Sequence, residues 1–125
     1  MYVSLLGVVI GGAFGSVCRW LISLKLNDAF PNLPLGTLLV NVAGGFLIGA
    51  VSAAFLKLPN LDPAWRLLVV TGFCGGFTTF STFSAEVVSM LQTGKVGWAT
   101  ATVLAHVAGS LLATFAGYAL VTRVG

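Results

Sequence analysis

The chain has very few charged residues for its length. Of its 125 residues, six are Lys or Arg and three are Asp or Glu. Charged residues make up 7% of the chain, against about 25% in an ordinary soluble domain. So few polar groups cannot cover the surface of a soluble globular protein, and that class is excluded. The net charge of +3 is scattered and forms no basic patch, so we expect no binding to nucleic acid.

Cysteine and histidine are scarce as well. The two cysteines, Cys18 and Cys74, lie in apolar stretches, with no CxxC motif and no cysteine–histidine spacing suited to a metal. We interpret both as reduced packing residues. The chain also lacks a nucleophile–base pair or a phosphate-binding loop of usable spacing, so we do not expect an enzyme.

Apolar residues dominate in their place and form 58% of the chain. Such a composition is typical of an integral membrane protein, and one helical span takes about 20 residues. Turn-forming segments divide the chain into four apolar runs with no room for an extramembrane domain. The sequence therefore predicts an all-α membrane protein with one domain, residues 1–125, and spans at about residues 3–24, 36–56, 64–91 and 96–121.

The basic residues at the two ends of these spans nearly balance. Three lie on the side of the termini, and two, Lys25 and Lys95, lie on the other side. By the positive-inside rule, so small a difference does not strongly favour one orientation of the chain in the membrane. One interpretation is that the chain inserts both ways and pairs antiparallel with itself. The other is that the bias of one residue, or Arg19, is enough to fix a single orientation.

Small and polar residues recur at four-residue spacing. In the first span these are Gly7, Gly11 and Gly15, a stripe that lets helix backbones approach closely. The fourth span carries a polar stripe, composed of Thr102, His106, Ser110, Thr114 and Tyr118. A single hydroxyl in a span usually bonds its own helix, but five polar residues in register indicate a pore-lining track or a polar contact between helices.

Three strongly polar residues lie deep in the apolar runs, namely Arg19, Asn41 and Glu86. Ionisable groups at such depth are costly and usually functional. Arg19 could reach a water-filled vestibule and attract anions there, or it could pair with Glu86 or with carbonyls at a helix end. Asn41 must face protein or water, since lipid cannot satisfy its amide.

The third span contains poor helix formers at mid-membrane depth. Gly75 and Gly76 are followed by Thr78 and Thr79, and we expect the helix to break in this stretch. A break is tolerated only inside protein or beside a water-filled cavity. Freed carbonyls could bind a small, singly charged cation, and the new helix start could attract an anion. In an antiparallel pair of chains, two such breaks could converge on one site.

Two phenylalanines follow the predicted break. Phe80 and Phe83 are three residues apart and share a helix face. The positive edges of their rings could hold an anion, and Ser81, Thr82 and Ser84 add hydroxyl donors. Weak donors of this kind let an ion enter and leave quickly, and they suit a small, strongly hydrogen-bonding anion better than chloride. The alternative is that both rings simply face lipid or the core.

Taken together, these stretches resemble the CrcB/Fluc family of fluoride channels. The similarity covers nearly the whole chain, and it is most specific in residues 36–46 (GTLLVNVAGGF) and 75–86 (GGFTTFSTFSAE). The resemblance implies a fluoride-selective channel that exports fluoride passively from the cytoplasm and so lowers its toxicity. It also implies a dual-topology, antiparallel homodimer in the lipid bilayer of the bacterial inner membrane.

The resemblance further implies roles for individual residues. A structural sodium ion, which is not transported, would bind the backbone carbonyls of Gly75 and Thr78 from both subunits. The fluoride pathway would include Asn41, Phe80, Phe83, Ser110 and Thr114. Arg19 would be the cation of the vestibule. His106 stands where many relatives carry another polar residue, and we include it in the predicted pathway with the hydroxyls of Ser81, Thr82 and Ser84.

Two other functions fit parts of the sequence. Small proton-coupled multidrug exporters also have four spans and often dual topology, and they need a membrane carboxylate. Glu86 is the only candidate for that carboxylate here, although it lies toward one end of the third span and not in the first. A purely structural membrane subunit is the third possibility, and in it substitutions at Phe80 or Phe83 would be silent.

Overall fold

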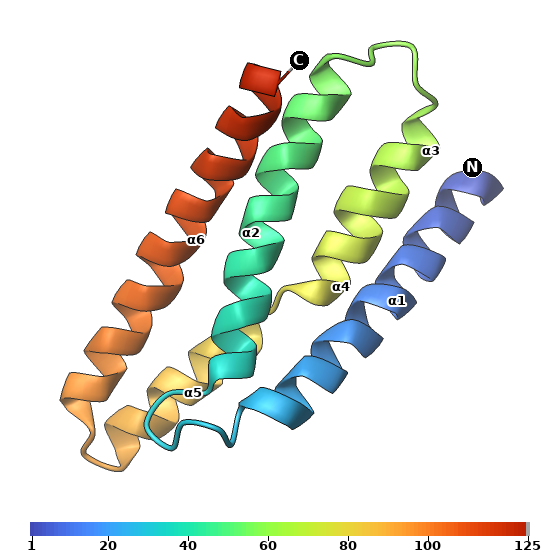
Figure 1. Ribbon diagram of the computed structural model, residues 1–125. Coiled ribbons are helices and arrows are strands. Elements are labelled where there is room, and N and C mark those ends of the chain that lie inside the picture. Colours follow the sequence, from blue (N-terminus) through green and yellow to red (C-terminus); the bar gives the residue numbers. More distant parts are fainter. Residues whose placement is uncertain (125) are drawn as a thin grey trace.

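The computed structural model describes residues 1–124, which fold as helices joined by short loops. Three of the four membrane-length helices are α1 (Tyr2–Leu26), α2 (Leu35–Leu56) and α6 (Val96–Val124). A composite third helix covers Pro63–Gln92. All four are long and apolar enough to cross a membrane, which confirms the prediction of an all-helical protein with four spans. The start of α1 and the end of α6 lie at one end of the bundle (Figure 1).

The third span is divided into segments, as predicted. It comprises α3 (Pro63–Arg66), η1 (Leu67–Cys74), α4 (Gly75–Phe77) and α5 (Phe80–Gln92). Asp62 begins the span by accepting a hydrogen bond from the backbone N–H of Ala64 at 2.9 Å. The segment η1 is π-helical, with wider turns than an α-helix. A run of apolar residues does not distinguish these two helix types, so the sequence did not predict this segment.

The break itself lies at Thr78 and Thr79, whose backbones are both extended. Gly75 and Gly76, which the sequence analysis grouped with the break, remain helical in α4. Gly76 has a packing role, because a Cβ atom there would lie 2.5 Å from the carbonyl oxygen of Gly12. Glycine at this position therefore allows α1 and α4 to touch and does not itself unwind the helix.

The glycines of the other spans also form close helix contacts. A Cβ atom on Gly49 of α2 would collide with the carbonyl oxygen of Thr114, and one on Gly117 of α6 would collide with that of Phe46. Gly11 and Gly15 of α1 meet the backbone of η1 in the same way. As a result α2 packs along α6, and α1 packs along η1 and α4.

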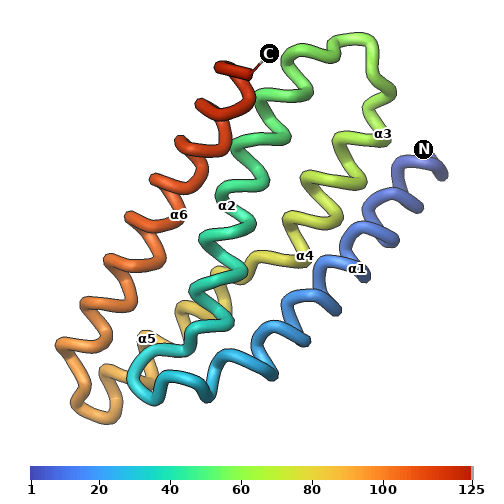
Figure 2. The backbone as a smooth tube through the Cα atoms, viewed as in Figure 1, coloured from blue at the N-terminus to red at the C-terminus, as the bar shows by residue number. Residues whose placement is uncertain are grey.

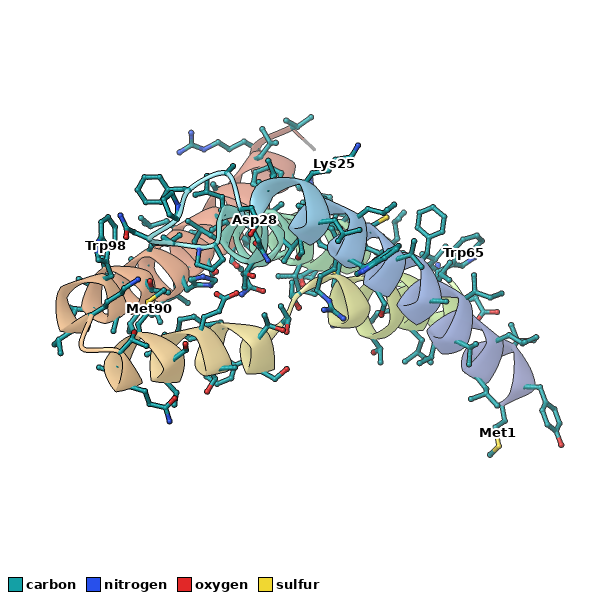
Figure 3. All side chains as sticks on the ribbon, turned by 90° about the horizontal axis from the view of Figure 1, so that it is seen from below. Met1, Lys25, Asp28, Trp65, Met90 and Trp98 are labelled. Atoms are coloured by element: carbon teal, nitrogen blue, oxygen red, sulfur yellow. The ribbon has the colours of Figure 1, made fainter. Side chains whose placement is uncertain are left out.

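The break also redirects the chain. Beyond it, α5 passes behind α2 and packs against the first part of α6 (Figure 2). Viewed from below, α5 with Met90 and the start of α1 with Met1 point to opposite sides (Figure 3). The outer faces of the helices carry large apolar side chains, such as Phe115 of α6, which is 79% exposed. Such faces suit contact with lipid or with another membrane helix.

Candidate functional site

A cavity of about 530 Å³ lies beside the break and is lined by α2, η1, α4, α5 and α6. It brings together many of the residues that the sequence analysis selected. Those in its lining are Asn41, Gly75, Thr78, Phe80, Phe83, His106 and Ser110. Apolar side chains complete the wall, and no Lys, Arg, Asp or Glu lines it. Its polar groups other than the imidazole of His106 are therefore uncharged.

Asn41 replaces the hydrogen bonds that the backbone loses at the break. Its Oδ1 accepts from the N–H of Thr79 at 2.7 Å, and its Nδ2 donates to the carbonyl oxygen of Thr79 at 3.0 Å. Buried backbone groups need such partners, because water is not there to replace them. The amide thus faces protein, one of the two surroundings predicted for it, and it binds α2 to the extended segment.

Two carbonyls at the break lose their helical partners. In an unbroken helix, the N–H of Thr79 would donate to Gly75 and the N–H of Thr82 would donate to Thr78. The first of these donors is bound to Asn41, and the second donates to Oγ1 of Thr79 at 3.2 Å. The carbonyl oxygens of Gly75 and Thr78 are therefore available to another ligand. No group of three His, Cys, Asp or Glu residues within residues 1–124 could hold a metal ion.

Arg19 is half-buried and lies against the same segment. Its Nε donates to the carbonyl oxygen of Gly76 at 2.9 Å, which satisfies a third backbone group at the end of α4. This is the contact with helix-end carbonyls that was one of the predicted alternatives, while Glu86 has a different partner. A cation at a helix C-terminus is also favoured by the helix dipole. Arg19 is not part of the lining of the cavity.

The two phenylalanines have different surroundings. Their ring centroids lie 5.4 Å apart in an edge-to-face arrangement. Phe83 is buried and stacks on His106 with a centroid distance of 4.4 Å, whereas Phe80 is 78% exposed. Both line the cavity, so the exposed ring of Phe80 forms one of its walls.

His106 is buried, with 4% of its surface exposed. Its Nδ1 lies 3.0 Å from Nδ2 of Asn41, and its Nε2 has no partner. Glu86 shows the same pattern: Oε2 accepts from the hydroxyl of Thr37 at 2.7 Å, while Oε1 has no partner. Within the described part of the chain, these are the two buried side-chain polar atoms left without a hydrogen bond.

Only part of the polar stripe on α6 reaches the cavity. Thr102 donates to the carbonyl oxygen of Trp98 at 2.7 Å, and Thr114 donates to that of Ser110 at 2.9 Å. These two hydroxyls are bonded within their own helix and lie outside the lining. His106 and Ser110 are the members that line the cavity. The middle of the stripe therefore lines the cavity, whereas the hydroxyls of Thr102 and Thr114 bond within α6.

The remaining predicted hydroxyls lie on other faces of α5. Ser81 and Ser84 are exposed, and Thr82 receives a hydrogen bond from the hydroxyl of Thr79 at 3.0 Å. Thr82 lines a second cavity, of about 440 Å³, which the sequence analysis missed. Its polar lining consists of Asn32, Thr82, Glu86, Ser89, Thr93 and Lys95. The spacing of the polar residues between 82 and 93 places them on one face of α5, and this pattern could have revealed the cavity.

Comparison with known proteins places this architecture in a family. The family model described as "CrcB-like protein, Camphor Resistance (CrcB)" matches residues 6–118. A protein of Erwinia tasmaniensis named "Fluoride-specific ion channel FluC" is 59% identical over 118 residues, which are 94% of this chain and 94% of its own. A Yersinia pestis protein named "Fluoride-specific ion channel FluC 1" is 55% identical over 123 residues, 98% of this chain and 97% of its own.

An Escherichia coli protein named "Fluoride-specific ion channel FluC" is 52% identical over 122 residues, which are 98% of this chain and 97% of its own. These similarities extend over all four membrane-length helices and include the broken segment. With those helices, the chain is a multi-pass membrane protein, and it belongs to the family of CrcB-like proteins.

Proposed function

We propose that this protein is a fluoride-selective ion channel that lets fluoride leave the bacterial cytoplasm through the inner membrane. The observation that carries the proposal is the cavity beside the break, whose wall combines phenyl rings with amide, hydroxyl and imidazole groups and holds no Lys, Arg, Asp or Glu. The names of the relatives support it, because they are names of fluoride-specific ion channels and not of enzymes.

A neutral lining suits passage better than tight binding. A buried Lys or Arg would hold an anion strongly, whereas hydroxyls and ring edges are weak enough to release it. We place Asn41, Phe80, Phe83, His106, Ser110 and Thr114 along or beside the pathway, with Ser81, Thr82 and Ser84 on the neighbouring faces of α5. Arg19, whose Nε is bonded to Gly76, would supply positive potential near one mouth.

Export through such a channel needs no ATP. Hydrogen fluoride is a weak acid that crosses lipid in its neutral form and ionises inside a near-neutral cell, where the anion is trapped. A membrane potential that is negative inside drives an anion outward by about 2.3 kcal/mol per 100 mV. A passive pathway therefore lowers the internal fluoride concentration and with it the toxicity, provided that chloride is excluded.

The working unit that we propose is an antiparallel homodimer with dual topology. The nearly balanced basic residues at the two ends of the spans support insertion in both orientations. Phe80 and Gly75 line the cavity and are exposed in a single chain. A second copy would cover this side and complete two pathways. A bundle of four helices encloses little interior space, which also favours an oligomer.

A structural sodium ion fits the centre of such a dimer. The carbonyl oxygens of Gly75, at the start of α4, and of Thr78, at the break, have both lost their helical partners. An antiparallel pair of chains would offer two oxygens from each subunit. Neutral carbonyl oxygens without a cluster of carboxylates suit a singly charged ion. The ion would join the two broken segments and would not itself be transported.

The test is fluoride efflux from proteoliposomes, followed with a fluoride-selective electrode. Valinomycin in a potassium gradient supplies the counter-current, and sodium is present or replaced by N-methylglucamine. We expect rapid efflux of fluoride, no efflux of chloride, and loss of activity after prolonged removal of sodium. Retention of fluoride as in protein-free vesicles would overturn the channel. Proton-coupled uptake of an aromatic cation by the same vesicles would favour the exporter that uses Glu86.

A further inference from the structure

The peptide group between Thr78 and Thr79 carries two of the polar groups that the break releases. Its N–H, which belongs to Thr79, donates to Oδ1 of Asn41 at 2.7 Å. Its carbonyl belongs to Thr78, and the N–H of Thr82 that would reach it in an unbroken helix donates to Oγ1 of Thr79 instead. The peptide is trans, so its N–H and its carbonyl point in opposite directions. Asn41 therefore directs the carbonyl of Thr78 away from α2.

The same contact determines whether the carbonyl of Gly75 is free. In an unbroken helix this carbonyl would accept from the N–H of Thr79. A backbone N–H has one hydrogen, and here it is bonded to Asn41. Without Asn41, the acceptor that helical geometry offers to Thr79 is the carbonyl of Gly75, and a buried N–H needs an acceptor. One side chain of α2 thus keeps one carbonyl free and directs the other.

Further contacts hold the backbone that bears these two carbonyls. Arg19 of α1 donates through Nε to the carbonyl of Gly76 at 2.9 Å, so that carbonyl is already bonded. The side chain of Thr78 packs against α2, because a Cβ atom on Gly44 would collide with its Cγ2. The segment from Gly75 to Thr78 is therefore fixed from both α1 and α2.

We propose that Asn41 is a positioning residue for a monovalent-cation site formed by the carbonyls of Gly75 and Thr78. The inference rests on the structural sodium ion of the proposed function and identifies the side chain that keeps its ligands open. Asn41 acts through the backbone, since the carbonyl of Thr78 points away from it. A carbonyl that is free and held in place binds a cation without first losing a hydrogen bond. The coupling is reciprocal, so the cation also stabilises the contact between Asn41 and Thr79.

The sequence allows this one peptide group to be observed by itself. Thr78 and Thr79 are the only adjacent threonines in the chain. In protein labelled with threonine that carries ¹³C at the carbonyl and ¹⁵N at the amide, a single ¹³C is therefore bonded to a ¹⁵N. NMR in lipid bilayers, filtered for that pair, reports the Thr78 carbonyl and the Thr79 N–H together. We expect sodium chloride, titrated against N-methylglucamine chloride, to shift the Thr78 ¹³C resonance to saturation.

Two substitutions of Asn41 separate its acceptor from the rest of the side chain. In Asn41→Leu the N–H of Thr79 should return to Gly75, and the Thr79 ¹⁵N resonance should move. The sodium concentration for a half-maximal shift should then rise by at least about fivefold, the equilibrium effect of one hydrogen bond that must be broken again. In Asn41→Asp one oxygen still accepts from Thr79, so this concentration should not rise. Equal sodium titrations for Asn41→Leu and the parent would overturn the proposal.

Gly49→Ala is the matched control for a general loss of stability. Gly49 lies about two helical turns beyond Asn41 on α2, and a methyl group there would collide with the carbonyl of Thr114, not with the broken segment. This variant should melt at a lower temperature but keep the sodium titration within about twofold of the parent, because distant sites act independently. A sodium response lost to the same extent in Gly49→Ala and Asn41→Leu would follow stability alone and would reject the positioning role.

The parent protein decides the matter if Asn41→Leu does not assemble. With ¹³Cγ-asparagine added to the threonine labels, we expect a dipolar contact between an asparagine ¹³Cγ and the ¹⁵N of Thr79, and its absence would overturn the proposal. Fluoride efflux is measured on the same vesicles. Vesicles that conduct while the Thr78 carbonyl ignores sodium would reject the cation site and its positioning but leave the channel standing. Vesicles that do not conduct would reject the channel, while the sodium titrations still decide the role of Asn41.

Discussion

Asn41 and Thr79 face each other across the broken third span, and the side-chain amide of Asn41 pairs with both backbone groups of Thr79, at 2.7 and 3.0 Å. The side chain of Asn41 thus provides the hydrogen bonds that adjoining turns provide in an unbroken helix. In lipid, an extended residue without such a partner would leave two backbone groups unsatisfied. The break is therefore maintained by a specific tertiary contact.

Asn41→Asp should abolish fluoride flux while the dimer still assembles. The added carboxylate repels an anion and removes the two hydrogens that Asn41 donates. One oxygen can still accept from the N–H of Thr79, while the other faces the carbonyl oxygen of Thr79, so the dimer should assemble with lowered stability. Efflux from proteoliposomes and size-exclusion chromatography check the two halves of the prediction. Normal flux in this variant would remove Asn41 from the pathway.

Thr79→Val should destabilise the start of α5 by about 1 kcal/mol, the usual cost of losing an N-cap hydroxyl. Oγ1 of Thr79 accepts from the N–H of Thr82, and valine has the same shape without the oxygen. Thr79→Ser keeps the oxygen and is the matched control. Unfolding in detergent, followed by circular dichroism, measures the difference. Equal stability of the two variants would show that the cap is dispensable.

Gly49→Ala should weaken the contact between α2 and α6 by about 1–3 kcal/mol, the range for overpacking a close contact. The new methyl group would collide with the backbone carbonyl of Thr114, which cannot move without shifting α6. Gly97→Ala is the control, because a Cβ atom there meets nothing within 4 Å. Thermal unfolding compares them. A parent-like melting temperature for Gly49→Ala would contradict the packing described here.

Phe83→Ile should lower fluoride flux by about threefold to tenfold, in proportion to the aromatic contact energy that is lost. The substitution removes a cavity wall and the ring that stacks on His106. Phe115→Ile is the control, since that ring lies on the outer face of α6 and is 79% exposed. Efflux assays at equal protein density compare the two. A silent Phe83→Ile would favour a purely structural subunit.

The four helices could be predicted from the sequence because hydropathy and length alone determine where a chain can cross lipid. The presence of a break could be predicted too, but not the residues at which the helix breaks. Gly75 and Gly76 have the composition of a break, yet Gly76 serves a contact with Gly12 of α1. Glycine suits both unwinding and close packing, and only the neighbouring helix decides between them.

Part of the cavity lining could be predicted from the sequence, but the pairing of its residues could not. Asn41 was recognisable because an amide in lipid needs a partner, yet that partner, Thr79, depends on how α2 lies against the broken segment. Thr37 was missed for the same reason: it reads as an ordinary helix residue until Glu86 of α5 is placed beside it. The register between two helices is set by packing and cannot be predicted from the hydropathy of either helix.

The π-helical turns of η1 determine the angular setting of everything that follows them. Each residue of an α-helix rotates the chain by about 100°, so shortening η1 by one residue would turn α4 by that angle about its own axis. The carbonyl of Gly76 would then point away from Arg19, and Thr79 would leave Asn41. The wide turns of η1 thus set the rotation of the following segment, so that Gly76 faces Arg19 and Thr79 faces Asn41.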